Sequence, residues 1–223
     1  MRSTLWFAGA VVGMIMLLGP ARDARPQEAT AVSADQALQK LKDGNERFAK
    51  DMLERKDVGA ARRATLAKGQ NPFAVILSCA DSRVPPEFIF NQGLGDVFVL
   101  RVAGNIADPF TIGSIEYAVG HLKAPLVVVL GHESCGAVEA GLAKAEFPGG
   151  LGKVIREIHV GTDLPPERAK ALTIAIKNNV LHHTALLTQR SEVLKEAAAR
   201  NQVRIVSGVY ELSSGKVQWL ESK

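Results

Sequence analysis

Four short apolar runs, each about as long as one β-strand, are spread along the chain. Near-continuous runs of this kind are typical of strands in a parallel sheet that is covered on both faces. The runs are FAVILS (73–78), DVFVLRV (96–102), LVVVL (126–130) and VRIVSGV (203–209), and stretches with helical spacing separate them at about 85–91, 109–123, 134–145 and 166–200. This alternation predicts an α/β fold with a mainly parallel central sheet of four strands and helices on both faces.

The segments on either side of these runs add further elements. Ser33 and Gln36 form a capping-box pair, which predicts that a helix begins at Ser33. A second short helical stretch covers 58–68. After the fourth run, residues 213–215 read Ser-Ser-Gly and predict a turn into a last short strand at 216–220. We expect that strand to lie antiparallel at the edge of the sheet.

Composition limits the class of protein. The chain has 223 residues, of which 47% are hydrophobic and 22% charged, and its net charge is +4. Such a chain can bury a substantial core as one domain, and its mixed charges do not indicate disorder. No block of lysine and arginine interleaves with aromatic residues, so nucleic acid is not an expected partner.

The first residues have the three parts of a secretory signal peptide. Arg2 is the only early charge, Leu5 to Leu18 is an apolar run, and Gly19-Pro20 ends it. The run is short for a membrane-spanning helix, although an uncleaved anchor is the alternative. We therefore expect an exported protein, periplasmic or secreted, that is not stably inserted in a membrane once the signal is removed. The expected boundaries are a signal peptide at 1–24 (cleaved somewhere in 21–29), a linker at 25–32 and a single domain at 33–223.

Two of the apolar runs are followed directly by residues that can bind a metal. Cys79 begins the segment CADSR after the first run, and His132 and Cys135 lie in GHESCGA after the third. Ligands in open α/β sheets bind beyond the carboxyl ends of the strands, so these side chains are expected at one end of the sheet. Two thiolates and one imidazole form a three-ligand zinc set that leaves a fourth position open, which is typical of a catalytic site.

A disulfide is the main alternative for the two cysteines. In an oxidising compartment, a pair of cysteines is read first as a disulfide. Asp81 and Arg83 beside Cys79, and His132 beside Cys135, favour a zinc site, because a disulfide needs none of them. A redox role is also weakened, because the cysteines are not in a C-x-x-C motif.

Both segments resemble the motifs of the β-class carbonic anhydrases. In that family, C-x-D-x-R carries the first zinc thiolate, and H-x-x-C follows about fifty residues later. Here they stand as Cys79 to Arg83 and His132 to Cys135, and the resemblance covers roughly residues 35–221. It implies a zinc lyase with one zinc per chain, in which zinc-bound hydroxide attacks carbon dioxide to give bicarbonate and a proton. It also implies a homodimer or homotetramer, with the N-terminal helices packed on a partner subunit.

The resemblance also implies roles for individual residues. Zinc lowers the pKa of a bound water toward neutrality, for which carbonic anhydrase is itself the standard example. Asp81 would accept a hydrogen bond from that water, and Arg83 would hold Asp81 in a bidentate pair. The alternative is that Asp81 binds the metal and closes the site. Three expected substrate-pocket residues follow the plant-like branch of the family, in which the site is open: Gln70, Phe98 and Tyr117. Gly136, directly after Cys135, is also expected at the pocket, because a glycine there lets the backbone approach the metal.

Two other functions remain open at this stage. The same zinc site could hydrolyse carbon disulfide or carbonyl sulfide, because the motif does not separate these molecules from carbon dioxide. A zinc-stabilised binding module without turnover is the other alternative. Asp81 and Arg83 argue against it, since a structural zinc normally has four protein ligands.

Overall fold

The four apolar runs form the parallel part of one five-stranded sheet. A computed structural model describes residues 32–220. The strand order is β2-β1-β3-β4-β5, and only the β4–β5 pair is antiparallel. The strands are β1 (Ala74–Ser78), β2 (Val97–Arg101), β3 (Leu126–His132), β4 (Arg204–Tyr210) and β5 (Val217–Leu220). The predicted α/β fold with an antiparallel edge strand is confirmed.

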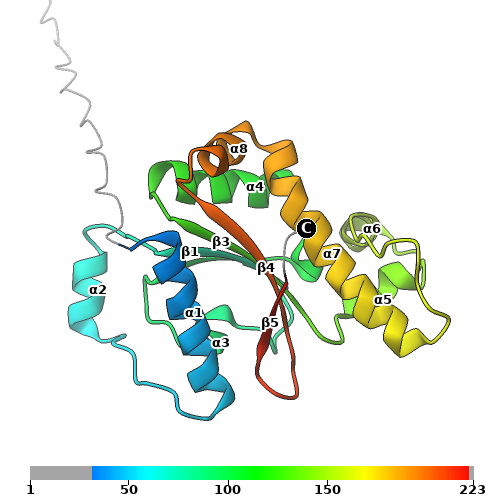
Figure 1. Ribbon diagram of the computed structural model, residues 1–223, viewed down its shortest axis with the longest axis horizontal. Coiled ribbons are helices and arrows are strands. Elements are labelled where there is room, and N and C mark those ends of the chain that lie inside the picture. Colours follow the sequence, from blue (N-terminus) through cyan, green and yellow to red (C-terminus); the bar gives the residue numbers. More distant parts are fainter. Residues whose placement is uncertain (1–31, 221–223) are drawn as a thin grey trace, which may run out of the picture.

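Helices pack on both faces of the sheet. They are α1 (Ala34–Ala49), α2 (Ala60–Leu66), α3 (Pro86–Ile89), α4 (Pro109–Glu116), α5 (Gly136–Leu142), α6 (Gly149–Arg156), α7 (Arg168–Arg190) and α8 (Glu192–Ala199), with a 3₁₀ turn η1 (Ala103–Asn105) and a π turn η2 (Tyr117–His121). Figure 1 shows α1 and α3 together on one side and α4, α7 and α8 grouped apart from them. Among the described residues, no helix is both long and apolar enough to cross a membrane.

The predicted helical region at 166–200 is divided in two. Ser191 has an extended backbone (φ −129°, ψ 111°) and caps α8 by accepting a hydrogen bond from the Leu194 N–H. Its hydroxyl also donates to Glu116 Oε1 at 2.6 Å. These contacts end α7 and begin α8, and a helical pattern cannot reveal them because Glu116 lies 75 residues away. Helix α6 was not predicted.

One face of the sheet is covered by α1 and α3. The capping box of Ser33 and Gln36 is present at the start of α1, as predicted. Ala37, Leu38 and Leu41 of this helix are buried against the chain's own core. In contrast, α2 has no buried residue. Packing of the N-terminal helices on a partner subunit stays a prediction. The absence of buried residues in α2 is compatible with it.

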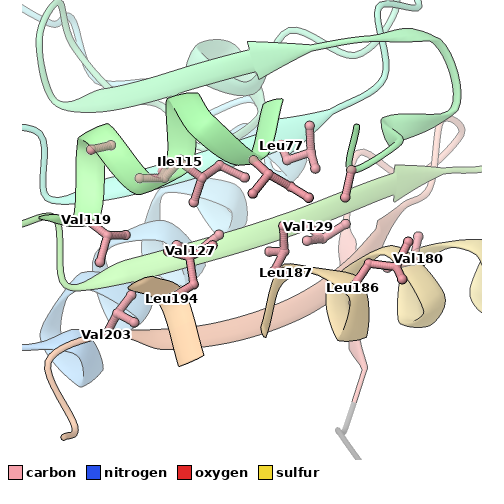
Figure 2. Packing of buried hydrophobic residues seen from close by; sticks show 14 of the residues in the cluster. Leu77, Ile115, Val119, Val127, Val129, Val180, Leu186, Leu187, Leu194 and Val203 are labelled. Carbon is pink, nitrogen blue, oxygen red and sulfur yellow. The ribbon is translucent and has the colours of Figure 1, made fainter. Parts of the chain in front are cut away.

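The opposite face carries the larger core. Figure 2 shows Val127 and Val129 of β3 beside Leu187 of α7 and Leu194 of α8. Both leucines have no exposed surface. Truncating a buried leucine of this kind to alanine typically costs about 2–5 kcal/mol of unfolding free energy. This core therefore fixes α7 firmly against the strands that lead to the site.

The register of the strands brings their carboxyl ends together. Ser78, the last residue of β1, pairs with Arg101 of β2 and with Leu130 of β3. Cys79 follows Ser78 directly, and His132 lies two residues after Leu130. Neighbouring parallel strands thus deliver both predicted ligands to one edge of the sheet, as expected for α/β folds. The predicted signal peptide and most of the predicted linker lie outside the described residues.

Candidate metal centre

The three predicted zinc ligands form one cluster. The Sγ atoms of Cys79 and Cys135 and the nearest ring nitrogen of His132 all lie within 4.8 Å of one another. The three residues are 4%, 2% and 0% exposed. Both cysteines are free thiols, so the disulfide alternative is not what the structure shows. Among the described residues, this is the only such group of potential metal ligands.

The His132 ring presents a bare nitrogen to the cluster. Its Nδ1 lies 2.9 Å from the carbonyl oxygen of Glu133, and a carbonyl can only accept, so Nδ1 carries the hydrogen. Nε2 then has a free lone pair. It is buried and has no hydrogen-bond partner. A buried polar atom without a partner is costly, and a metal ion would satisfy it.

Two turns carry the predicted ligands: the first covers residues 79–83 and the second covers residues 132–136. The second turn is shaped by the strand and helix that flank it. Strand β3 ends at His132, Ser134 takes a left-handed conformation (φ 54°), and Cys135 is the N-cap of α5. The N–H groups of Ala137 and Val138, in the first turn of α5, face the Cys135 sulfur. Partial positive charge at a helix N-terminus favours a thiolate at this position.

The two thiols are electrostatically unequal. Hydrogen bonding from Cys135 lowers the pKa of Cys79, and the N–H groups of Asp81 and Gly104 act in the same direction. The neighbouring Cys79 thiolate and burial raise the pKa of Cys135. Without a metal, the two thiols therefore share one proton, and the surroundings of Cys79 favour its thiolate form more strongly than those of Cys135.

Asp81 and Arg83 form the predicted bidentate pair. Arg83 Nε donates to Asp81 Oδ1 at 2.9 Å, and Arg83 Nη2 donates to Oδ2 at 2.7 Å. These bonds, with the Arg83 N–H, hold the pKa of the Asp81 carboxyl well below its usual range. Asp81 Oδ2 lies 3.9 Å from His132 Nε2. The carboxylate is thus ionised, held by Arg83 and aimed at the cluster.

Two supports of the first turn, residues 79–83, were given no role at the site from the sequence. Arg101 Nε donates to the Cys79 carbonyl at 3.1 Å, and its Nη2 donates to the Asp81 carbonyl. The Gly104 N–H donates to Cys79 Sγ at 3.3 Å. Arg101 lies next to the end of the second apolar run, so a cation close to a strand end was the available signal.

The predicted pocket residues are only partly brought together. The rings of Phe98 and Tyr117 lie 6.4 Å apart, and Tyr117 also stacks on His121 at 5.1 Å. Tyr117 is 47% exposed, and Phe98 packs partly against the core. Gln70 is exposed in the segment before β1. Their roles in substrate binding stay predictions.

Gly136 is the first residue of α5, directly after Cys135. A Cβ atom at this position would have no neighbour within 4 Å. The open space borders the second turn, so an incoming molecule could approach the backbone there.

Comparisons with known proteins agree with this geometry. A family model described as carbonic anhydrase matches residues 74–217. Carbonic anhydrase 2 of Mycobacterium tuberculosis is 43% identical over 185 residues, which cover 81% of this chain and 89% of that protein. The carbonic anhydrase of Mycolicibacterium smegmatis is 42% identical over 188 residues, covering 82% and 91%.

Solved structures show the same fold. The β-carbonic anhydrase of Coccomyxa in complex with acetazolamide has a TM-score of 0.62 and 29% identity, and covers 82% of this chain and 86% of its own. A tetrameric β-carbonic anhydrase of Sordaria macrospora has a TM-score of 0.61 and 29% identity, covering 71% and 85%. A β-carbonic anhydrase of Aspergillus fumigatus has a TM-score of 0.64 and 28% identity, covering 85% and 91%.

Proposed function

The chain belongs to the β-class carbonic anhydrases and catalyses the reversible hydration of carbon dioxide, and we propose that Cys79, His132 and Cys135 hold its catalytic zinc. One observation carries the assignment of the ligands: a buried cluster of two thiols and an imidazole whose Nε2 has no partner. Thiolate and imidazole are ligands that zinc prefers, and three of them leave one position for substrate.

Zinc bound there supplies a Lewis acid that activates water at neutral pH. The chain's own contribution is orientation of that water. Because the Asp81 carboxylate is ionised and faces the cluster, it can only accept a hydrogen bond. It thereby fixes one hydrogen of the attacking water and turns an oxygen lone pair toward carbon dioxide. Arg83 holds the carboxylate at the angle this requires, through two parallel hydrogen bonds.

The arrangement favours an open site. Both Asp81 oxygens are bound by Arg83, so the carboxylate is not among the three clustered ligands. A structural zinc would normally use a fourth protein ligand, which argues against a non-catalytic zinc module. We infer that Asp81 stays on Arg83 at neutral pH, because Arg83 donates a hydrogen bond to each of its two oxygens.

Substrate contacts and assembly are further parts of the proposal. Gln70 would donate a hydrogen bond to a bicarbonate oxygen, Phe98 and Tyr117 would form apolar walls for carbon dioxide, and the space at Gly136 would admit it. Gln70 and Tyr117 are exposed in the single chain, which fits a pocket completed by a second subunit in a homodimer or homotetramer. Tetramers occur in the Sordaria macrospora relative.

Export is the last part of the proposal. It rests on the signal-like sequence of residues 1–24, and it places the enzyme in the periplasm or outside the cell. N-terminal sequencing of the protein from the cell envelope tests it. A mature chain that begins between residues 21 and 29 is expected, and a chain that retains residues 1–20 would contradict cleavage.

The test of the catalytic proposal is stopped-flow hydration of carbon dioxide, with zinc content determined on the same samples. Rapid hydration at neutral pH with one zinc per chain is expected. Activity that appears only at alkaline pH would mean that Asp81 binds the metal and closes the site. Full zinc without hydration at any pH would exclude the proposed activity and direct the test to carbon disulfide and carbonyl sulfide.

The role of Asp81 is tested by Asp81→Ala. The variant should keep its zinc and lose about 10²–10⁴-fold in kcat, the range typical of a lost proton acceptor. Asp43→Ala is the matched control, because Asp43 is an exposed aspartate of α1 that only pairs with Gln39. Full turnover by Asp81→Ala would refute the orienting role.

A further inference from the structure

We propose that Asn179 of α7 is a positioning residue for the metal centre, acting through Gly104 on the sulfur of Cys79. This inference rests on the proposed function, since it assigns a task within the same site. The residue has no exposed surface. It lies 75 residues from Gly104 in the sequence, and the fold alone brings them together.

Both ends of the Asn179 side chain are used. Its Nδ2 donates to the Gly104 carbonyl at 2.8 Å, and its Oδ1 accepts from the His159 N–H at 2.9 Å. The buried amide therefore ties η1 to the segment that follows α6. Removing it would leave a buried carbonyl and a buried N–H without partners, which is costly.

Gly104 transmits this restraint to the metal centre. Its N–H donates to Cys79 Sγ while its carbonyl accepts from Asn179. The two peptide planes that flank Gly104 are related only by φ and ψ, so fixing the carbonyl limits the direction of the N–H. Gly104 has φ 73°, and a Cβ there would lie 2.3 Å from Ile158 Cδ1. Glycine is thus needed at this position. Because glycine can adopt many backbone conformations, a contact from outside the loop is needed to fix this one.

His183, one helical turn after Asn179, restrains the same two segments. Its Nδ1 accepts from the Ala107 N–H at 3.0 Å, and its Nε2 lies 3.2 Å from the Glu157 carbonyl. His183 is also fully buried. One face of α7 therefore holds the loop 104–107 at both of its ends, and that loop carries the N–H which faces the thiolate.

A hydrogen bond to a metal-binding thiolate withdraws negative charge from the sulfur. It also fixes the direction of the sulfur, and residues that support metal ligands in this way typically change metal affinity or activity about 10–100-fold when removed. Loss of the Asn179 restraint should therefore alter the Cys79–metal bond itself. A residue with a purely structural role would change stability without a change at the sulfur.

The test compares Asn179→Leu with Asn178→Leu in the full-length metal-loaded protein. Asn178 is the matched control, because it is the neighbouring asparagine of α7 and donates to the Val160 carbonyl, away from Gly104. With cobalt in place of zinc, Asn179→Leu should shift the thiolate-to-cobalt absorption band. It should also lower zinc affinity about tenfold in competition with a chelator and reduce kcat with KM within about twofold. Asn178→Leu should leave the band and zinc affinity at wild-type values.

An unshifted band and unchanged zinc affinity in folded Asn179→Leu would overturn the proposal. If this variant does not fold, Asn179→Ala removes the same donor to Gly104 without adding an apolar side chain, and the same readouts decide. If neither folds, exchange of the Asn179 side-chain amide hydrogens in the wild type decides, because Nδ2 is the donor to Gly104. Exchange at least about a hundredfold slower than in an unstructured peptide supports the restraint, and unprotected exchange contradicts it.

The outcomes separate this inference from the proposed function. A wild-type protein that binds cobalt through thiolate but does not hydrate carbon dioxide would end the proposed function, and the cobalt spectra would still test Asn179. A wild-type protein without a thiolate-to-cobalt band would refute the ligand assignment itself.

Discussion

The two turns that carry the cysteines are supported in different ways. The turn 132–136 belongs to regular structure, because His132 pairs with Tyr210 in the β3–β4 ladder and Cys135 caps α5. The turn 79–83 belongs to no helix or strand. Side chains and N–H groups from elsewhere hold it, above all Arg101 and Gly104.

This difference decides how each turn should respond to substitution. Backbone hydrogen bonds that hold the second turn do not depend on side-chain identity, so few single substitutions can loosen it. The first turn depends on particular side chains at the end of β2 and, through Gly104, on α7. It is therefore the more vulnerable half of the site, although its sequence motif is the more distinctive one.

The largest effect should come from replacing the ligands themselves. The loss of activity should be equal for the two turns. Cys79→Ser and Cys135→Ser should each lose zinc and reduce carbon dioxide hydration to near the uncatalysed rate, because a hydroxyl is a poor substitute for a thiolate. Zinc content and stopped-flow rates measured together check this. An active, zinc-replete variant of either cysteine would refute its assignment as a ligand.

A smaller effect should come from Arg101 and should fall on the first turn alone. Arg101→Met keeps the length of the side chain and removes both donors to the Cys79 and Asp81 carbonyls. We expect kcat to fall about 10–100-fold with zinc retained, because Asp81 loses its orientation. Arg204→Met is the control, since Arg204 pairs only with Asp35 at the surface, far along the sheet from the site.

Equal kcat values for Arg101→Met and the wild type would show that the first turn holds its shape without side-chain support. The contrast between the two turns would then be wrong. A loss of zinc in Arg101→Met would instead show that the support extends to the ligand Cys79 as well as to Asp81.

The contrast also explains what the sequence could predict. The strands could be predicted because each is a continuous apolar run. Cys79, His132 and Cys135 could be predicted as ligands because they lie just after such runs. Asp81 and Arg83 were found because they lie two and four residues after Cys79, within the C-x-D-x-R motif. The motif residues are thus local in sequence, and local patterns reveal them.

The residues that hold the first turn are not local. Arg101, Asn179 and His183 meet their partners over 20 to 76 residues, through the crossing of separate strands and helices. Neither asparagine nor histidine within a helical pattern indicates which loop it will restrain. A neighbouring subunit, which the resemblance implies, is likewise beyond what the pattern of one chain reveals.

The smallest effect concerns His183 of α7, which holds the loop 104–107. Burial lowers the pKa of His183 from 6.5 to about 4, because the neutral ring accepts from Ala107 and is shielded from water. The unfolded chain takes up this proton near pH 6.5 and the folded chain only near pH 4. The unfolding free energy should therefore fall as the pH drops through this window, by about 2 kcal/mol between pH 7.5 and pH 5 from this residue.

His183→Gln removes the titrating group, so its unfolding free energy should depend less on pH than that of the wild type over the same interval. Asn178→Gln, at a neighbouring residue of α7 that does not titrate, should keep the wild-type dependence. Urea unfolding at pH 7.5 and pH 5 measures all three proteins. If His183→Gln and the wild type lose the same free energy on acidification, His183 is not a neutral buried support, and the loop that reaches Cys79 must be held by Asn179 without its help.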